Sequence, residues 1–311
     1  MTPNAFYLQT PLRSLSNFLY RHNRAFLALL LGPPLLWFVV IYLGSLLALL
    51  WQGFYSFDDY SMTVLPKLTL DNYGKIFAHA NLDIVLRTLA MAASVTLASA
   101  IIAFPIAYYM SVYASKTVKG FFYIGVMLPM WASYIVKAYS WTVILAKGGI
   151  VYWVVGQLGL LSLLEALLQT PYIGGSTLST SHFGRFLVFT YIWLPFMVLP
   201  IQAAIERVPH NLTQASMDLG ANAAKTFRYV LLPLAFPGIV AGSIFTFSLT
   251  LGDYIIPTLV GPSGLFIGNF VYVQQGAAGN IPLAAAFTAV PIVLIAVYLT
   301  IAKRLGAFDA L

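Results

Sequence analysis

The sequence predicts an all-α membrane protein with six transmembrane helices, and two observations lead to that fold class. The chain is 60% hydrophobic and 8% charged, whereas soluble domains carry about 25% charged residues. Its apolar residues also gather in long runs, without the alternation that the strands of a membrane barrel show. A surface with so few charges must face lipid. Membrane lipid is therefore an expected partner, and a separate soluble catalytic domain is not expected.

Six runs are long enough to cross a bilayer, because a helix needs roughly 20 apolar residues to span a hydrocarbon core of about 30 Å. They are expected at 26–51, 84–110, 120–146, 183–203, 232–257 and 283–302. Several contain proline, which bundled membrane helices tolerate. The first run follows arginines, as in a signal peptide, but it is far longer than the apolar core of one and is interpreted as a retained span. After the third span, LGLLSLLEALL indicates a helix on the membrane interface or packed on the bundle.

The distribution of positive charge predicts the orientation in the membrane. Ten of the 16 Lys and Arg residues would share one side, namely Arg13, Arg21, Arg24, Lys116, Lys119, Arg207, Lys225, Arg228, Lys303 and Arg304. The positive-inside rule then places both termini in the cytoplasm. We expect a cytoplasmic N-terminal segment (1–25), a six-helix transmembrane domain (26–303) and a cytoplasmic tail (304–311). Topology accounts for the net charge of +7, so nucleic acid is not expected as a partner.

The residues that could carry catalysis or bind a metal are not arranged for either role. Cysteine is absent, which excludes thiolate ligands and a cysteine nucleophile, and the four His residues lack the spacing of a metal site. Gly220 to Thr226 lacks the Gly before Lys that a phosphate-binding loop requires. The stretch Gly261–Gly264 (GPSG) contains the GxSG of intramembrane serine proteases, but no His follows it to act as the base. We expect no enzyme, no catalytic residue and no metal or other cofactor.

The loop 206–233, hereafter the knuckle, is predicted to form two short helices with a sharp turn between them. One helical face would carry Leu212, Ala215, Ser216 and Leu219, which recur at i, i+3, i+4 and i+7. Gly220 would end the first helix, and Asn222 would cap a second helix with Phe227 on its inner face. Pro233 marks the start of the next span. The charge distribution puts the knuckle in the cytoplasm, and its shape suits docking into a partner's groove.

The knuckle resembles the EAA loop of the membrane permeases of bacterial ATP-binding cassette importers, E-A-A-x3-G-x9-I-x-L-P. The matching positions are Gln214, Ala215, Ser216, Gly220, Val230, Leu232 and Pro233, and Asp218 and Phe227 are also kept. Gln214 replaces the Glu of the pattern, and Ser216 replaces its second Ala. The resemblance implies that these residues, with Leu212, Leu219 and Asn222, couple the chain to an ATPase. Gln214 lacks the carboxylate that could pair with an arginine of that ATPase, so docking is expected by shape, through Leu212, Ala215, Leu219 and Phe227.

The resemblance extends over most of the chain. The stretches 68–73, 128–141, 194–206 and 251–274 resemble the first permease of spermidine/putrescine importers. It implies a type I importer permease fold in the bacterial inner membrane and a polyamine substrate. It also implies a second, similar permease, two ATPase subunits that bind the ATP, and an extracytoplasmic binding protein that delivers the substrate.

Six residues are candidates for the substrate path: Asp253, Tyr254, Lys137, Tyr139, Trp141 and Trp193. A carboxylate at membrane depth is costly, which favours a functional role for Asp253, and aromatic faces attract cations. The resemblance places Asp253 at the outer mouth of the pore. Two alternatives remain open: Asp253 is a solvated span end, and Lys137 and the aromatic residues are structural.

Other functions are weighed against this one. Similar importers carry opines or aminoethylphosphonate. An ion-coupled secondary transporter would need carboxylates near the middle of the membrane, and Asp253 is the one available. A membrane enzyme would need a nucleophile with its base, or a metal cluster. The sequence therefore favours the importer permease.

Overall fold

The structure is a computed structural model that describes residues 23–304. Most of the expected N-terminal segment (1–22) and of the C-terminal tail (305–311) lies outside these residues. The long helices are α2 (Asn23–Trp37), α3 (Gly44–Gln52), α5 (His79–Val112), α6 (Lys116–Trp131), α7 (Tyr134–Ile144), α10 (His182–Glu206), α13 (Leu232–Gly252) and α16 (Ile281–Arg304). In the described part, five helices are long and apolar enough to cross a membrane, and the bent pair α6–α7 makes a sixth if it is counted as one span.

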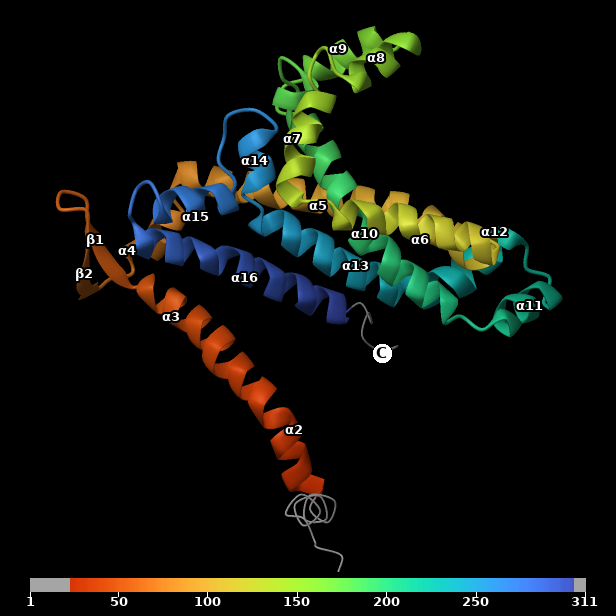
Figure 1. Cartoon of the computed structure of the whole chain (residues 1–311), viewed down its shortest axis with the longest axis horizontal. Coiled ribbons are helices and arrows are strands. Elements are labelled where there is room, and N and C mark those ends of the chain that lie inside the picture. Colours follow the sequence, from red (N-terminus) through yellow and green to blue (C-terminus); the bar gives the residue numbers. More distant parts are fainter. Residues whose placement is uncertain (1–22, 305–311) are drawn as a thin grey trace, which may run out of the picture.

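The centre of the bundle is formed by α5, α10 and α13, which pack along one another (Figure 1). Two glycines let α13 approach α10 closely. A Cβ at Gly238 would lie 2.5 Å from Ala204 and from the carbonyl of Pro200, and one at Gly242 would lie 2.7 Å from the Met197 sulfur. Small residues at helix contacts are the usual means of close packing in lipid, where no hydrophobic force drives the helices together.

The first span leaves the bundle. α2, the π-helical segment η1 (Phe38–Leu43) and α3 run as one continuous helix. The α3 part of this helix contacts α16, whereas the α2 part lies away from the other spans (Figure 1). None of its most apolar window is buried. An apolar helix exposed on all sides suits contact with lipid or with another membrane chain.

The third span differs from the expected continuous helix over 120–146. α6 ends at Trp131 and α7 begins at Tyr134, with a bend of 98° between them. Ala132 and Ser133 have extended ψ angles of 143° and 133°, which no α-helix contains. The span expected at 120–146 is therefore broken, since α7 turns away from the direction of α6.

The fifth span is also shorter than expected. α13 ends at Gly252, and Asp253 already has an extended ψ of 131°. A separate short helix, α14 (Ile255–Leu259), follows, and then α15 (Ile267–Gln275). The prediction that Asp253 lies within the span was wrong, because it stands in the junction between α13 and α14.

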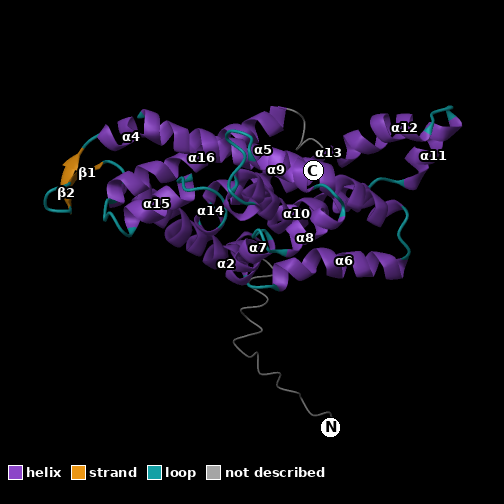
Figure 2. Ribbon diagram, turned by 90° about the horizontal axis from the view of Figure 1, so that it is seen from above, coloured by secondary structure: helices purple, strands orange, loops and turns teal. Residues whose placement is uncertain are grey.

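The two ends of the bundle carry different elements (Figure 2). One end carries the knuckle helices α11 (His210–Asp218) and α12 (Ala223–Thr226), followed by η3 (Phe227–Leu231). The other end carries a hairpin of β1 (Tyr55–Asp58) and β2 (Thr63–Leu68) and α4 (Asp71–Ile76). α8 (Ile150–Gln157), α9 (Leu161–Leu168) and η2 (Leu178–Thr180) instead follow α7 on the side of the bundle (Figure 1). As expected for LGLLSLLEALL, α9 lies outside the spans, and its Leu164 and Leu168 pack on the bundle.

The β-hairpin has no counterpart in the sequence predictions. The residue that holds it in place, however, lies in the stretch 68–73 (LTLDNY) named above. Buried Asn72 donates from its amide nitrogen to the carbonyls of Gly53 and Tyr55, at 3.0 and 2.8 Å. These bonds join α4 to the start of the hairpin. The stretch LTLDNY therefore has a structural role, which is to hold the hairpin against the end of α3.

Candidate functional site

The turn of the knuckle has the geometry predicted for it. α11 ends at Asp218, and Gly220 has a φ of +81°, in the left-handed region that favours glycine. The N–H of Gly220 donates to the carbonyl of Met217 at 2.8 Å, and the N–H of Ala221 donates to that of Ser216 at 3.1 Å. This pair of bonds is the Schellman motif, which satisfies the last carbonyls of a helix.

The second helix of the knuckle begins as expected at Asn222. Its side chain accepts a hydrogen bond of 2.9 Å from the N–H of Lys225, so it caps α12. The hydroxyls of Ser216 and Thr226 lie 3.0 Å apart and join the two helices. α12 continues through η3 into α13 without a break in helical geometry. A displacement of the knuckle would therefore act directly on the fifth span.

The outer surface of the knuckle is apolar and exposed. Leu212 is 42% exposed, Met217 56% and Leu219 89%, and the side chains of Gln214, Ala215 and Asp218 are also exposed. Sequence reasoning missed Met217, which lies between the members of the predicted face. Ser216, placed on that face, is half-buried and turned toward Thr226.

Phe227 packs into the bundle. Its ring makes edge-to-face contacts with Phe104 and Tyr108, with centroids 5.4 and 6.2 Å apart, and it packs against the buried cluster around Met110 and Ile201. The ring of Phe227 thus anchors the knuckle to α5, and its contact with a partner stays a prediction. Leu232 is half-buried and Pro233 exposed at the start of α13.

An ion pair stands where the bundle meets the knuckle. Lys119 Nζ lies 2.5 Å from Glu206 Oε1, and the amide of Gln202 donates to the same oxygen at 2.8 Å. Glu206 is the last residue of α10, and Lys119 lies in the first turn of α6. The pair thus ties the third span to the fourth directly before the knuckle begins.

At the opposite end of α13, Asp253 connects three elements. Its Oδ2 accepts a hydrogen bond from the hydroxyl of Tyr134, the first residue of α7. Its Oδ1 accepts one of 2.9 Å from the N–H of Ile256 at the start of α14. Trp193, on α10, stacks on Tyr134 with centroids 5.8 Å apart. We call Tyr134, Trp193, Asp253 and Tyr254 the mouth cluster.

The mouth cluster lines a cavity of about 380 Å³ together with Ser248, Leu249, Gly252 and Ile255. Asp253 is the one acidic residue among these lining residues. Tyr134 was not among the residues predicted for the path, because its partner Asp253 is 119 positions away in the chain.

A second cavity of about 240 Å³ adjoins the first, since both are lined by Tyr254 and Ile255. Tyr139 lines it, as does Tyr272, which stacks on Tyr254 with centroids 4.9 Å apart and ring planes 11° apart. The structure therefore brings Tyr139, Trp193, Asp253 and Tyr254 to two neighbouring cavities, as a path would require.

Lys137 and Trp141, the remaining two candidates, line neither cavity. Lys137 donates to the carbonyl of Pro129 at 2.6 Å. That carbonyl lies in the last turn of α6, where no following helical N–H can reach it. Trp141 packs against Tyr191 with centroids 5.0 Å apart. Both contacts are compatible with the open alternative in which these side chains are structural, and their place on the path stays a prediction.

Metal binding has no support within residues 23–304, which contain no group of three His, Cys, Asp or Glu residues placed to hold an ion.

Membrane-length helices around a close-packed centre, with a helical knuckle at one end and a lined mouth at the other, define a multi-pass membrane transport subunit. The chain belongs to the family described as "Binding-protein-dependent transport system inner membrane component", whose model matches residues 96–307. It is thus a permease subunit of an ATP-binding cassette importer.

Relatives of known sequence agree with this family. The chain is 64% identical to the "Inner membrane ABC transporter permease protein YdcU" of Escherichia coli (strain K12), over 98% of each chain. It is 28% identical to the "Spermidine/putrescine transport system permease protein PotB" of Haemophilus influenzae, over 86% of this chain and 90% of that one.

Solved structures share the fold. The transporter that imports the acidic polysaccharide alginate has a chain with a TM-score of 0.68 and 17% identity, matched over 94% of this chain and 99% of that one. The MetNI methionine transporter gives a TM-score of 0.53 and 17% identity, over 74% of this chain and 95% of that one. The predicted type I importer permease fold is confirmed.

Proposed function

We propose that this chain is one permease half of an importer for polyamines. The observation that carries the proposal is the mouth cluster, in which a single carboxylate lies between aromatic rings at the edge of a cavity. The likeness to the spermidine/putrescine permease PotB supports the same substrate class.

The mouth cluster suits an ammonium group. Each carboxylate oxygen has two lone pairs, and Asp253 uses one on each oxygen, for Tyr134 and for the N–H of Ile256. These two bonds fix the carboxylate, and a substrate ammonium would bind to its remaining acceptor capacity. The faces of Trp193 and Tyr254 add cation–π attraction. An extended diamine could then place its second ammonium along the Tyr139 cavity.

The knuckle supplies the coupling in this proposal. Two ATPase subunits dock, one on the knuckle of this chain and one on that of a second, similar permease, and they bind the ATP, so this chain needs no cofactor. The exposed side chains of Leu212, Met217 and Leu219 form the apolar contact. Because α12, η3 and α13 are continuous, drawing the knuckles together tilts α13 and moves Asp253 at its other end. A binding protein delivers the substrate at the mouth.

Both termini and the knuckle lie in the cytoplasm in this proposal, because the basic residues gather there. Arg207, Lys225, Arg228, Lys303 and Arg304 all fall at or near the knuckle end of their helices. The Asp58–Asp59 turn and the mouth cluster then face the binding protein.

The substrate class is tested by uptake. The full complex, with its own binding protein and ATPase, is reconstituted in proteoliposomes and given radiolabelled putrescine, spermidine or aminoethylphosphonate with ATP inside. We expect uptake of at least one polyamine and competition by the other. Uptake of aminoethylphosphonate with no polyamine uptake would overturn the proposal.

A further inference from the structure

A fully buried arginine near the start of α10 is bonded to the loop that follows α14. Arg185 donates from Nε to the carbonyl of Val260 at 2.7 Å. Its Nη2 donates to the carbonyls of Pro257 and Pro262, at 3.2 and 3.0 Å. All three acceptors lie within six residues of one another, and the residue has no exposed surface.

The charge of Arg185 is not neutralised by an acid. Within residues 23–304 the ion pairs join Arg87 to Asp83 and Lys119 to Glu206. Arg185 instead has His182 Nδ1 at 3.3 Å and the ring of Phe266 at 4.5 Å. A buried charge is costly unless it is fully hydrogen-bonded. The loop carbonyls therefore stabilise Arg185, and their rigid geometry is the one that a planar guanidinium can match.

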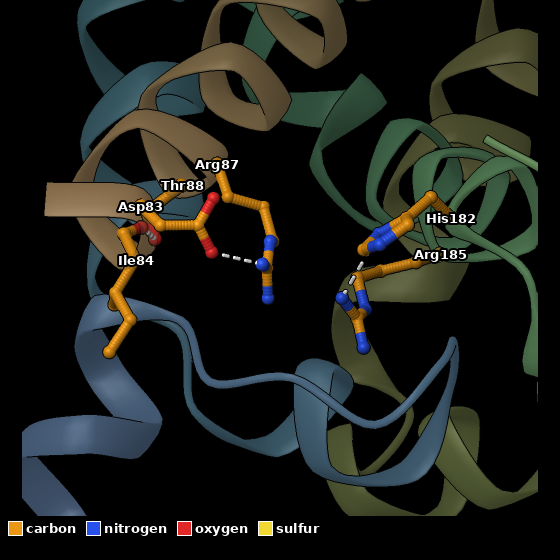
Figure 3. Close-up of polar contacts among 6 residues, drawn as sticks. All are labelled: Asp83, Ile84, Arg87, Thr88, His182 and Arg185. Atoms are coloured by element: carbon orange, nitrogen blue, oxygen red, sulfur yellow. Dashed lines mark hydrogen bonds and ion pairs between the residues drawn. The ribbon is translucent and has the colours of Figure 1, made fainter. Parts of the chain in front are cut away.

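Two glycines of this loop let it come close to two arginines. Gly261 has a φ of +101°, and a Cβ there would lie 2.6 Å from the guanidinium of Arg185. A Cβ at Gly264 would collide with Nη1 of Arg87. Figure 3 shows the side chains of Arg87 and Arg185 reaching toward the same loop from α5 and α10. The GPSG stretch thus has its two glycines where the two arginines approach.

The helix that follows this loop, α15, also fixes the position of the mouth cluster. The side chain of Asn269 donates to the carbonyl of Tyr254 and to the hydroxyl of Thr258, at 2.8 and 2.6 Å. The N–H of Ile267 donates to Thr88 on α5 at 3.1 Å. α14 is therefore held at its end by Arg185 and along its length by α15. Asp253 is bonded to the first turn of α14, so its orientation depends on this framework.

We propose that Arg185 is a positioning residue of the substrate mouth. Through the carbonyls of residues 257, 260 and 262 it holds α14 against the fourth span, and α14 in turn orients the Asp253 carboxylate. The inference rests on the proposed function for its substrate, but the bonds that carry it do not depend on which solute is imported.

A spin label tests the structural step without any substrate. The chain has no cysteine, so Ser263→Cys, at an exposed position in the loop, gives a single labelling site on this chain, which is labelled before the complex is assembled. Arg185→Lys keeps the charge, but an ammonium lacks the rigid planar donors that let the guanidinium bond to three carbonyls. We expect this variant to raise the mobility of the label. Gly261→Ala, which strains the same contact from the loop side, should do likewise. Arg228→Lys, the same change in η3 at the knuckle end of the bundle, is the matched control and should leave the mobility unchanged. Unchanged mobility in both Arg185→Lys and Gly261→Ala would overturn the inference.

Transport kinetics test the functional step. We expect Arg185→Lys to raise the KM for polyamine uptake about tenfold, the effect of losing a hydrogen bond to a charged group, with a maximal rate close to that of the unmodified chain. In a double-mutant cycle with Asp253→Asn, the two effects should be strongly non-additive, because both act on one carboxylate. Additive effects, or a fall in maximal rate with an unchanged KM, would show that Arg185 does not act through Asp253. No polyamine uptake by the unmodified complex would count against the proposed substrate, and the spin label would still decide whether Arg185 holds the loop.

Discussion

The hydroxyl of Tyr134 donates a hydrogen bond to Oδ2 of Asp253 and thereby joins the first turn of α7 to the end of α13. This bond crosses the two places where the spans deviate from simple helices, the 98° bend after α6 and the end of α13 at Gly252. Each residue of the pair stands directly after one of these irregularities. The mouth cluster is therefore built at the break of the third span and at the end of the fifth.

The charge of Asp253 is expected to govern uptake. Asp253→Asn keeps the size and most of the hydrogen bonding but removes the charge. The loss should be about 1–3 kcal/mol, which is about five- to 150-fold in apparent affinity or rate. Putrescine and spermidine uptake by proteoliposomes measures it. Asp71→Asn, the same change at an exposed position of α4, is the control and should have no effect. Unchanged uptake in Asp253→Asn would make Asp253 a solvated span end.

Tyr134→Phe should have a smaller effect than Asp253→Asn. It keeps the ring that stacks on Trp193 but removes the hydroxyl that orients the carboxylate. Loss of one such hydrogen bond predicts a KM about two- to tenfold higher, with the charge still present. Tyr42→Phe, the same change at an exposed position of η1 away from both cavities, is the matched control and should leave the KM unchanged. A Tyr134→Phe variant as impaired as Asp253→Asn would contradict the orienting role.

Gly220 is expected to be required for coupling. A Cβ at this position would meet no atom within 4 Å, so a substitution acts through the backbone alone. Gly220→Val forces a β-branched residue into the left-handed region, at a cost of about 1–2 kcal/mol. We expect normal membrane insertion, with transport uncoupled from ATP hydrolysis. Gly220→Asn, which tolerates this φ, should retain most of the coupling. Normal transport and assembly in Gly220→Val would rule out the assignment.

The sidedness of the knuckle can be measured at Leu219, which is the most exposed of its apolar residues. Leu219→Cys in this cysteine-free chain should react with an impermeant maleimide from the cytoplasmic side only, and more slowly once the ATPase is bound. Ser216→Cys should share this sidedness but react more slowly, because Ser216 is half-buried against Thr226. Tyr60→Cys, at the fully exposed hairpin turn, should react from the opposite side. Labelling of Leu219→Cys from outside would reverse the whole orientation.

The sequence predicts the knuckle far better than the mouth. Gly220 and Asn222 act within a few residues of themselves, through backbone conformation and capping, so local pattern was sufficient. The bend after Trp131 leaves no trace in hydropathy, because both arms of the span are apolar. Phe227 has the spacing of a docking residue, and only the neighbouring α5 shows that its ring is turned inward. Contacts such as Arg185 with Val260, which lie 75 positions apart, depend on the packed fold.

The last prediction distinguishes two roles for Lys137, a structural cation and a substrate contact. Its ammonium bonds to the carbonyl of Pro129 at the end of α6, where a cation also meets the negative end of the helix dipole. Lys137→Met should destabilise the complex by about 1–2 kcal/mol, seen as a lower midpoint of thermal unfolding in detergent. The KM for uptake should stay the same, since Lys137 lines neither cavity. Lys137→Arg keeps the donor and should restore the midpoint. A changed KM at an unchanged midpoint would instead place the Lys137 ammonium on the substrate path, where its positive charge would argue against a polycationic substrate.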